Sequence, residues 1–179
     1  ETLAPEELTE AVADYDLFME AITAVSPVPI RFDEIAGEAK GYYHSGDKEI
    51  VIQKGMSESQ TIKTAIHETG HARLHDKDIM EKQGIEKDRL TKEVEAESVA
   101  YCVCSAFDVD TSEYSFPYIA GWSSNRDMKE LKASMDIIRK TAGEMIDELS
   151  DNLQELFAEK KQLLESEQKQ KLIPAMEAA

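Results

Sequence analysis

The segment 67–71 reads HETGH, two histidines four residues apart with a glutamate directly after the first. It falls within a stretch, 58–74, that is predicted to be a helix on independent grounds. Ser57 and Gln60 match a capping box, in which side chains supply partners for the free amide groups at a helix start. The motif and its structural context therefore agree.

Residues four apart on a helix lie on the same face, so His67 and His71 can bind one metal ion. Glu68 is placed to reach a water molecule on that ion, as the HExxH motif requires of its general base. The alternative is a surface helix with two unrelated histidines. Gly70 argues against it, because glycine inside a helix costs stability unless packing or function requires it. The sequence predicts a zinc (Zn²⁺) site.

A catalytic zinc ion usually has three protein ligands and one open position for water. A second helix, predicted over about 87–107, offers Glu93, Glu95 and Glu97 as the third ligand. Glu93 and Glu97 share a helix face, whereas Glu95 points nearly opposite. One acid of the pair could bind the metal while the other orients a ligand histidine. The residues alone leave the choice open, and three solvated charges are the alternative.

The remaining elements are predicted from periodicity and turn residues: a helix over 5–25, strands over 28–32, 42–44 and 49–53, and a long charged helix over about 126–171. These elements predict an α+β fold, with a small antiparallel sheet packed on the HExxH helix and a long C-terminal helix. We expect a single domain over 1–179, with its core at about 27–125 and a helical extension at about 126–172.

Charge and composition limit the function classes. Acidic residues outnumber basic ones by 37 to 20, and the net charge of -17 repels nucleic-acid phosphates and anionic membranes. No apolar run is long enough to span a bilayer. Cys102 and Cys104 are predicted to be buried small residues that do not form a disulfide. We expect a soluble, cytoplasmic protein without direct nucleic-acid binding, and the first residue, Glu1, suggests a fragment of a longer protein.

Two segments, HETGHARLH and EVEAESVAY, together resemble the gluzincin metallopeptidases, and more closely the ImmA/IrrE-type peptidases and the ArdC-type antirestriction proteins of mobile elements. The resemblance implies that Glu93 is the third zinc ligand and that Glu97 holds a ligand histidine. The motif differs slightly, since gluzincins of this kind have aspartate at the second position. The run PYIAGW, with Tyr118, Ile119 and Trp122, is similar to the segment that follows the peptidase core in ArdC-type proteins.

The resemblance implies a zincin-like fold and a zinc-dependent peptidase, active or latent, with a protein or peptide substrate. One alternative is a non-catalytic, zinc-stabilised module for antirestriction or protein binding, and another is an acidic nucleic-acid mimic. His75 is expected to support the site or to pack rather than to bind the metal. Tyr101, Tyr118 and Trp122 could line the cleft or belong to the core. The sequence does not indicate an oligomeric state.

Overall fold

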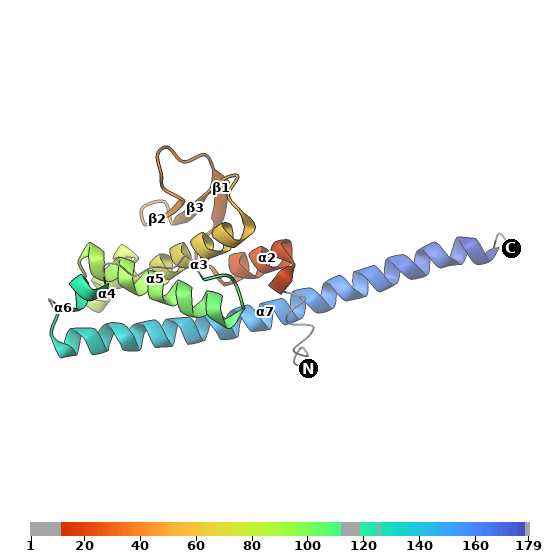
Figure 1. Cartoon of the computed structure of the whole chain (residues 1–179). Helices are drawn as coiled ribbons and strands as arrows, with labels where there is room; N and C mark the ends of the chain where they lie inside the picture. Colours follow the sequence, from red (N-terminus) through yellow and green to blue (C-terminus); the bar gives the residue numbers. More distant parts are fainter. Residues whose placement is uncertain (1–11, 112–118, 125, 178–179) are drawn as a thin grey trace.

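The computed structural model describes residues 12–111, 119–124 and 126–177. Its elements are, in chain order, α2 (Tyr15–Val25), β1 (Ile30–Asp33), β2 (Gly41–His44), β3 (Glu49–Gln53), α3 (Glu58–Leu74), α4 (Lys77–Gln83), α5 (Arg89–Ala106), α6 (Ile119–Ser124) and α7 (Met128–Glu177). Figure 1 shows the sheet on one side of the helices and α7 running beneath them. The predicted α+β class, with a sheet on the HExxH helix and a long C-terminal helix, is confirmed.

Helix α3 begins at the position that the capping residues predicted. The Ser57 side chain accepts a hydrogen bond from the backbone N–H of Gln60 at 3.2 Å. Gln60 does not close the box, because its side-chain amide instead donates to Thr64 Oγ1 at 3.2 Å. The helix ends at His75, whose N–H bonds the carbonyl of His71. The HETGH segment thus occupies the second half of a regular helix.

The sheet has the order β1-β3-β2 and is mixed, which corrects the prediction of an antiparallel sheet. β2 and β3 form the predicted antiparallel hairpin, with Tyr43 opposite Ile50, but β1 pairs with β3 in parallel, with Ile30 opposite Ile50. After β1 the chain crosses to the far edge to form β2, and the hairpin turn then returns it between the two strands. β3 is therefore central, and β2 has a free edge.

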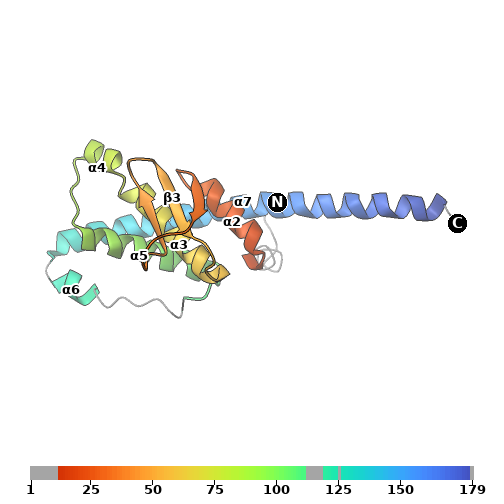
Figure 2. The same cartoon turned by 90° about the horizontal axis from the view of Figure 1, so that it is seen from above.

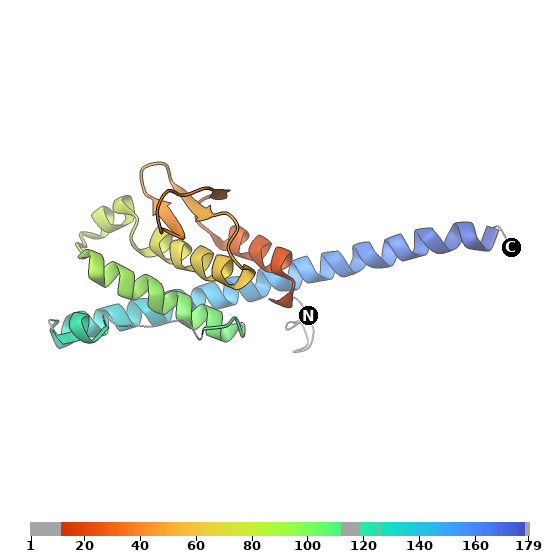
Figure 3. The ribbon, with the colours of Figure 1, turned by 45° about the horizontal axis from the view of Figure 1, so that its top comes forward.

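Helix α3 lies between the sheet and α5 (Figure 3). A β-carbon added at Gly70 would lie 3.6 Å from Cα of Ala96, so the two helices approach closely at small residues. Ala96 itself is fully buried. This contact brings the HExxH face of α3 next to the first half of α5, where the three candidate glutamates lie.

The buried core draws on α2 and on the first half of α7 as well as on the segment 27–125. Phe18 from α2 and Met145, Leu149 and Leu153 from α7 are fully buried. Each such side chain stabilises the fold by roughly 1.5–3 kcal/mol. Beyond this region α7 continues away from the other elements (Figures 1 and 2), with exposed Leu163 among charged residues. Within the described ranges, no helix combines the length and apolarity needed to cross a membrane.

Some details differ from expectation. Helix α4 was not predicted, although Asp76 caps its start and Gly84, with φ 64°, ends it. Both cysteines are free, as expected, but Cys102 is exposed and only Cys104 is buried. Trp122 is a core residue whose indole N–H donates to Thr91 Oγ1 at 3.0 Å. Tyr118 and the start of the first predicted helix lie outside the described residues.

Candidate metal centre

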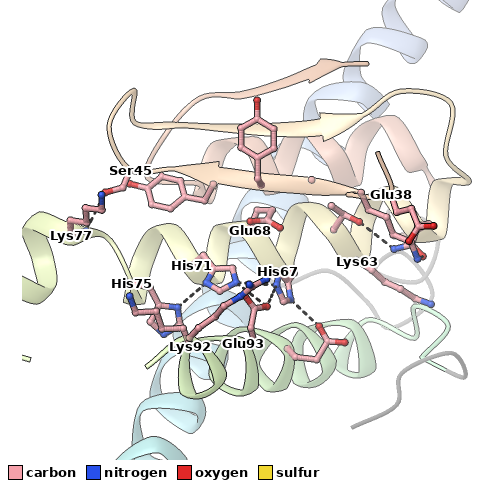
Figure 4. Close-up of a pocket in the computed structure, with 18 residues that line it drawn as sticks. Glu38, Ser45, Lys63, His67, Glu68, His71, His75, Lys77, Lys92 and Glu93 are labelled. Carbon is pink, nitrogen blue, oxygen red and sulfur yellow. Dashed lines mark hydrogen bonds and ion pairs between the residues drawn. The ribbon is translucent and has the colours of Figure 1, made fainter. Parts of the chain in front are cut away.

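The structure brings His67, His71 and Glu93 together at the contact between α3 and α5 (Figure 4). The Nε2 atoms of the two histidines are 3.1 Å apart, and Glu93 Oε2 lies 3.6 Å from each. Donor atoms about 2.0–2.2 Å from a zinc ion in tetrahedral geometry are about 3.3–3.6 Å apart. The two separations of 3.6 Å lie in this range, and the separation of 3.1 Å between the two Nε2 atoms is slightly shorter. The spacing is close to that of a zinc site, and two imidazoles with a carboxylate are donors that zinc prefers.

Glu97 contacts the far side of the first histidine, with its Oε2 2.9 Å from His67 Nδ1. A carboxylate at that distance requires the proton on Nδ1, which leaves the lone pair of Nε2 directed at the metal position. Burial lowers the pKa of His67, but the nearby carboxylates of Glu93 and Glu97 outweigh burial and raise the pKa to about 10. Without an ion, the two carboxylates therefore favour a second proton, on Nε2, and zinc would have to displace that proton to bind His67. His67 and His71 in turn hold the pKa of Glu93 well below its usual range.

The second histidine is held by a buried chain of hydrogen bonds that the sequence did not indicate. His71 Nδ1 lies 2.9 Å from His75 Nδ1, and His75 Nε2 lies 2.9 Å from Glu95 Oε2. Lys87 and Ser134 also donate to Glu95, at 2.6 and 2.7 Å. His75 therefore supports the site rather than binding the metal position, as expected. Glu95 points away from the metal position, also as expected, but it is fully buried rather than solvated.

The protonation states along this chain follow from chemistry. Burial would raise the pKa of Glu95, but bonds from His75, Lys87 and Ser134 lower it, so Glu95 is charged. Burial lowers the pKa of His75, which is therefore neutral and donates from Nε2. Its Nδ1 must then accept a hydrogen bond from the N–H at His71 Nδ1. This leaves the lone pair of His71 Nε2, like that of His67, directed at the metal position.

Glu68 lies beside the three donor atoms, between α3 and the edge strand β2, and is only 8% exposed. Burial raises the pKa of Glu68, and the charges of His67 and His71 oppose part of the rise. The backbone N–H of Tyr43, on β2, lies near enough to the Glu68 carboxylate to oppose the rise as well. Glu68 is thus a buried carboxylate with a raised pKa, aimed at the metal position by the sheet.

Close approach of β2 to α3 depends on Gly41. A β-carbon at this position would lie 2.6 Å from Thr64 Cγ2 and 3.1 Å from the carbonyl oxygen of Val51, closer than side chains pack. A larger residue would therefore require a shift of the Thr64 side chain or of the strand beside Glu68. The glycine therefore sets the distance between the edge strand and the metal centre.

Asp76 fixes the other end of the hairpin to the end of α3. Its carboxylate accepts hydrogen bonds from the Tyr43 hydroxyl, from Ser45 Oγ at 3.0 Å and from Lys48 Nζ at 2.6 Å. Burial would raise the pKa of Asp76, but these bonds hold it well below its usual range. Asp76 also caps α4 through the N–H of Asp78 at 3.0 Å. One buried carboxylate thus ties β2, the hairpin turn and α4 together.

The metal centre opens into a cleft of about 820 Å³ between β2, α3 and the start of α5. Of the aromatic residues proposed from sequence, Tyr101 is 40% exposed and does not line the cleft, and Trp122 is in the core. Tyr43 lines it instead. The sequence signal for Tyr43 was its place in the predicted hairpin, but the approach of that hairpin to α3 depends on tertiary packing.

Comparison with known proteins finds a family model that matches the segment that holds this centre. Residues 26–105 match the family described as the IrrE N-terminal-like domain. The chain is also 34% identical over 123 residues to an uncharacterized protein of Bacillus anthracis, an alignment that covers 68% of this chain and 20% of that protein. The chain thus spans about a fifth of that relative's length. No solved structure matches. The ArdC-type resemblance stays a prediction, whereas the family match supports an ImmA/IrrE-type metallopeptidase domain over residues 26–105, the segment that holds the metal centre.

Proposed function

We propose that this domain hydrolyses peptide bonds, with zinc held by His67, His71 and Glu93 and with Glu68 as the general base. The observation that carries the proposal is the convergence of three donor atoms beside a buried carboxylate in an open cleft. Within the part of the chain that is described, no fourth His, Cys, Asp or Glu completes the donor set. A catalytic zinc site needs that open position, whereas a structural site fills it with protein.

A bound zinc ion would supply a water molecule of lowered pKa and polarise the carbonyl of the substrate. Glu68 accepts the proton of that water and passes it to the leaving nitrogen. Its raised pKa brings it closer to neutral pH than an ordinary glutamate. The nearby N–H of Tyr43 favours the charged form of the carboxylate, which is the form that accepts the proton.

The edge of β2 suits an extended peptide. Gln53 N–H bonds the carbonyl of Lys40 at 2.9 Å, so the backbone groups of residue 40 face β3. Successive residues of a strand direct their backbone N–H and C=O groups to opposite sides. The backbone groups of Gly41 and Tyr43 therefore face away from β3, toward the cleft. A substrate that lies along this edge gains main-chain hydrogen bonds and places a scissile bond over the metal centre.

The test compares the wild type with Glu68→Gln on peptide mixtures. Mass spectrometry identifies the cleavage products, and elemental analysis measures the zinc content of each protein. The amide keeps the shape of the side chain but cannot accept a proton, so we expect retained zinc and a loss of turnover of about 10²- to 10⁴-fold. Equal turnover by both proteins would overturn the mechanism. If the wild type binds zinc and cleaves nothing, the non-catalytic alternative is favoured.

The cellular setting is a separate proposal. We propose, from the sequence resemblance alone, that the domain comes from an ArdC-like antirestriction protein of a mobile element and acts in the cytoplasm on a protein substrate. Expression of the full parent protein in cells that carry a restriction system tests this proposal. Protection of incoming DNA that depends on Glu68 would support it, and protection that is indifferent to Glu68→Gln would separate antirestriction from hydrolysis.

A further inference from the structure

Basic side chains gather in the metal cleft of a chain that is strongly acidic overall. Acids outnumber bases by 37 to 20 in the whole sequence. The basic residues that line the cleft are Lys40, Lys63, Lys77, Arg89 and Lys92. Of the acids that line it, Glu68, Glu93 and Glu97 belong to the metal centre, which leaves Glu38. Outside the metal centre, the balance of charge in the cleft is therefore the reverse of the balance in the chain.

Three of these cations have no partner among the described residues. The side chains of Lys77, Arg89 and Lys92 make neither a hydrogen bond nor an ion pair there. Elsewhere, basic side chains with carboxylate partners include Arg31, Lys48, Arg73, Lys87 and Arg126. The charges of the three cleft residues are thus available to a ligand.

The three cations lie at one end of the cleft. Figure 4 shows Lys77 and Lys92 on the side of His75, and Glu38 and Lys63 at the opposite end. The N–H of Lys77 bonds Ser45 Oγ at 3.2 Å, which places the start of α4 against the end of β2. Arg89 precedes Lys92 by three residues in α5 and so shares its face. A peptide along β2 would meet all three on one side of its scissile bond.

We propose that this end of the cleft selects peptide segments with aspartate or glutamate side chains on one side of the scissile bond. The inference rests on the proposed function, because it names the substrate class of the same site. Charges separated by more than about 8 Å are largely screened at physiological salt, so a short acidic segment responds mainly to the nearby cations. A long nucleic acid would extend over the acidic outer surface, which repels its phosphates.

The first measurement is binding, and it does not depend on turnover. Zinc-loaded Glu68→Gln is titrated into labelled ten-residue peptides that differ only in three residues, which are Glu, Gln or Lys. We expect the Glu peptide to bind about 10-fold more tightly than the Gln peptide at low salt, and the Lys peptide more weakly than both. The preference should shrink as salt rises.

Variants then assign the preference to residues. In the Glu68→Gln background, the added changes Lys77→Gln, Arg89→Gln and Lys92→Gln should together remove the difference between the Glu and Gln peptides. Lys82→Gln, Lys129→Gln and Lys132→Gln together are the matched control, because these three lysines are exposed and lie outside the cleft. Melting curves verify that each variant is folded. A preference that survives in the folded triple variant would overturn the proposal.

Cleavage by the wild type separates this proposal from the proposed function. Hydrolysis with equal kcat/KM for Glu and Gln peptides, together with equal binding, would overturn the charge preference and leave the peptidase standing. Selective binding of the Glu peptide without any hydrolysis would support the cleft preference and count against the peptidase. If a single-stranded oligonucleotide binds as tightly as the Glu peptide, the cleft recognises phosphates and the proposal fails.

Discussion

His75 Nε2 lies 2.9 Å from Glu95 Oε2, and this buried pair orients His71 through Nδ1, the ring nitrogen that faces away from the metal position. Glu95→Gln keeps the shape but removes the charge that stabilises the donor tautomer of His75. We expect zinc affinity to fall about 10- to 100-fold, as for other residues that orient a ligand histidine. We also expect a loss of stability of about 3–5 kcal/mol, because Lys87 loses its buried partner.

Competition with a chelator measures the first effect and urea unfolding of the metal-free protein measures the second. Glu81→Gln is the control, because Glu81 is an exposed acid on α4. An unchanged zinc affinity in folded Glu95→Gln would show that the chain of bonds serves the core alone.

Glu93 and Glu97 lie on the same face of α5, but only Glu93 is close to both Nε2 atoms. Glu93→Ala removes one of three donors, so near-complete loss of zinc binding is expected. Glu97→Ala releases His67 Nδ1 and should cost about 10- to 100-fold in affinity. Zinc titration of the two variants decides the order. If Glu97→Ala is the more damaging change, the assignment of the third ligand is wrong.

Metal removal should lower the melting temperature. An ion that binds only the folded state adds about 4 kcal/mol when its free concentration is 1,000 times the dissociation constant. A chelator should therefore shift the melting curve of the zinc-loaded wild type downward, and His71→Ala should show no such shift. His44→Ala serves as the control, since His44 is exposed and pairs with Asp47. A wild-type curve that is indifferent to both zinc and chelator would count against a metal centre.

Much of the fold and site could be predicted because the signals are local. The Ser57 cap located the start of α3, and the turn residues after His44 located the hairpin. His67 and Glu68 were identified from spacing along one helix. The choice of Glu93 needed the family resemblance, because helix periodicity places Glu97 on the same face.

The rest depends on packing between distant segments. The parallel pairing of β1 was missed because strand order is not encoded in the strand itself. Glu95 was set aside because it points away from the metal face of α5, yet that direction leads to His75 and to Ser134 on α7. The role of Asp76 could not be predicted from the sequence either, because its partners lie about 30 residues earlier in the chain.

Asp76 should make stability depend on pH. Its pKa is held below the ordinary value of about 3.9, so its contribution is complete above that value and is lost as the pH falls below it. Asp76→Asn removes the charged acceptor shared by Tyr43 and Lys48, and we expect a loss of about 1–3 kcal/mol at pH 7. The difference from wild type should stay constant down to about pH 5 and shrink by about pH 3.5. Urea unfolding at the three pH values measures this difference.

Asp78→Asn is the control, because Asp78 also pairs with Lys48 but is exposed and should contribute little. A difference that grows as the pH falls would mean that Asp76 is protonated in the folded protein, and that the hairpin is held to α3 by other contacts.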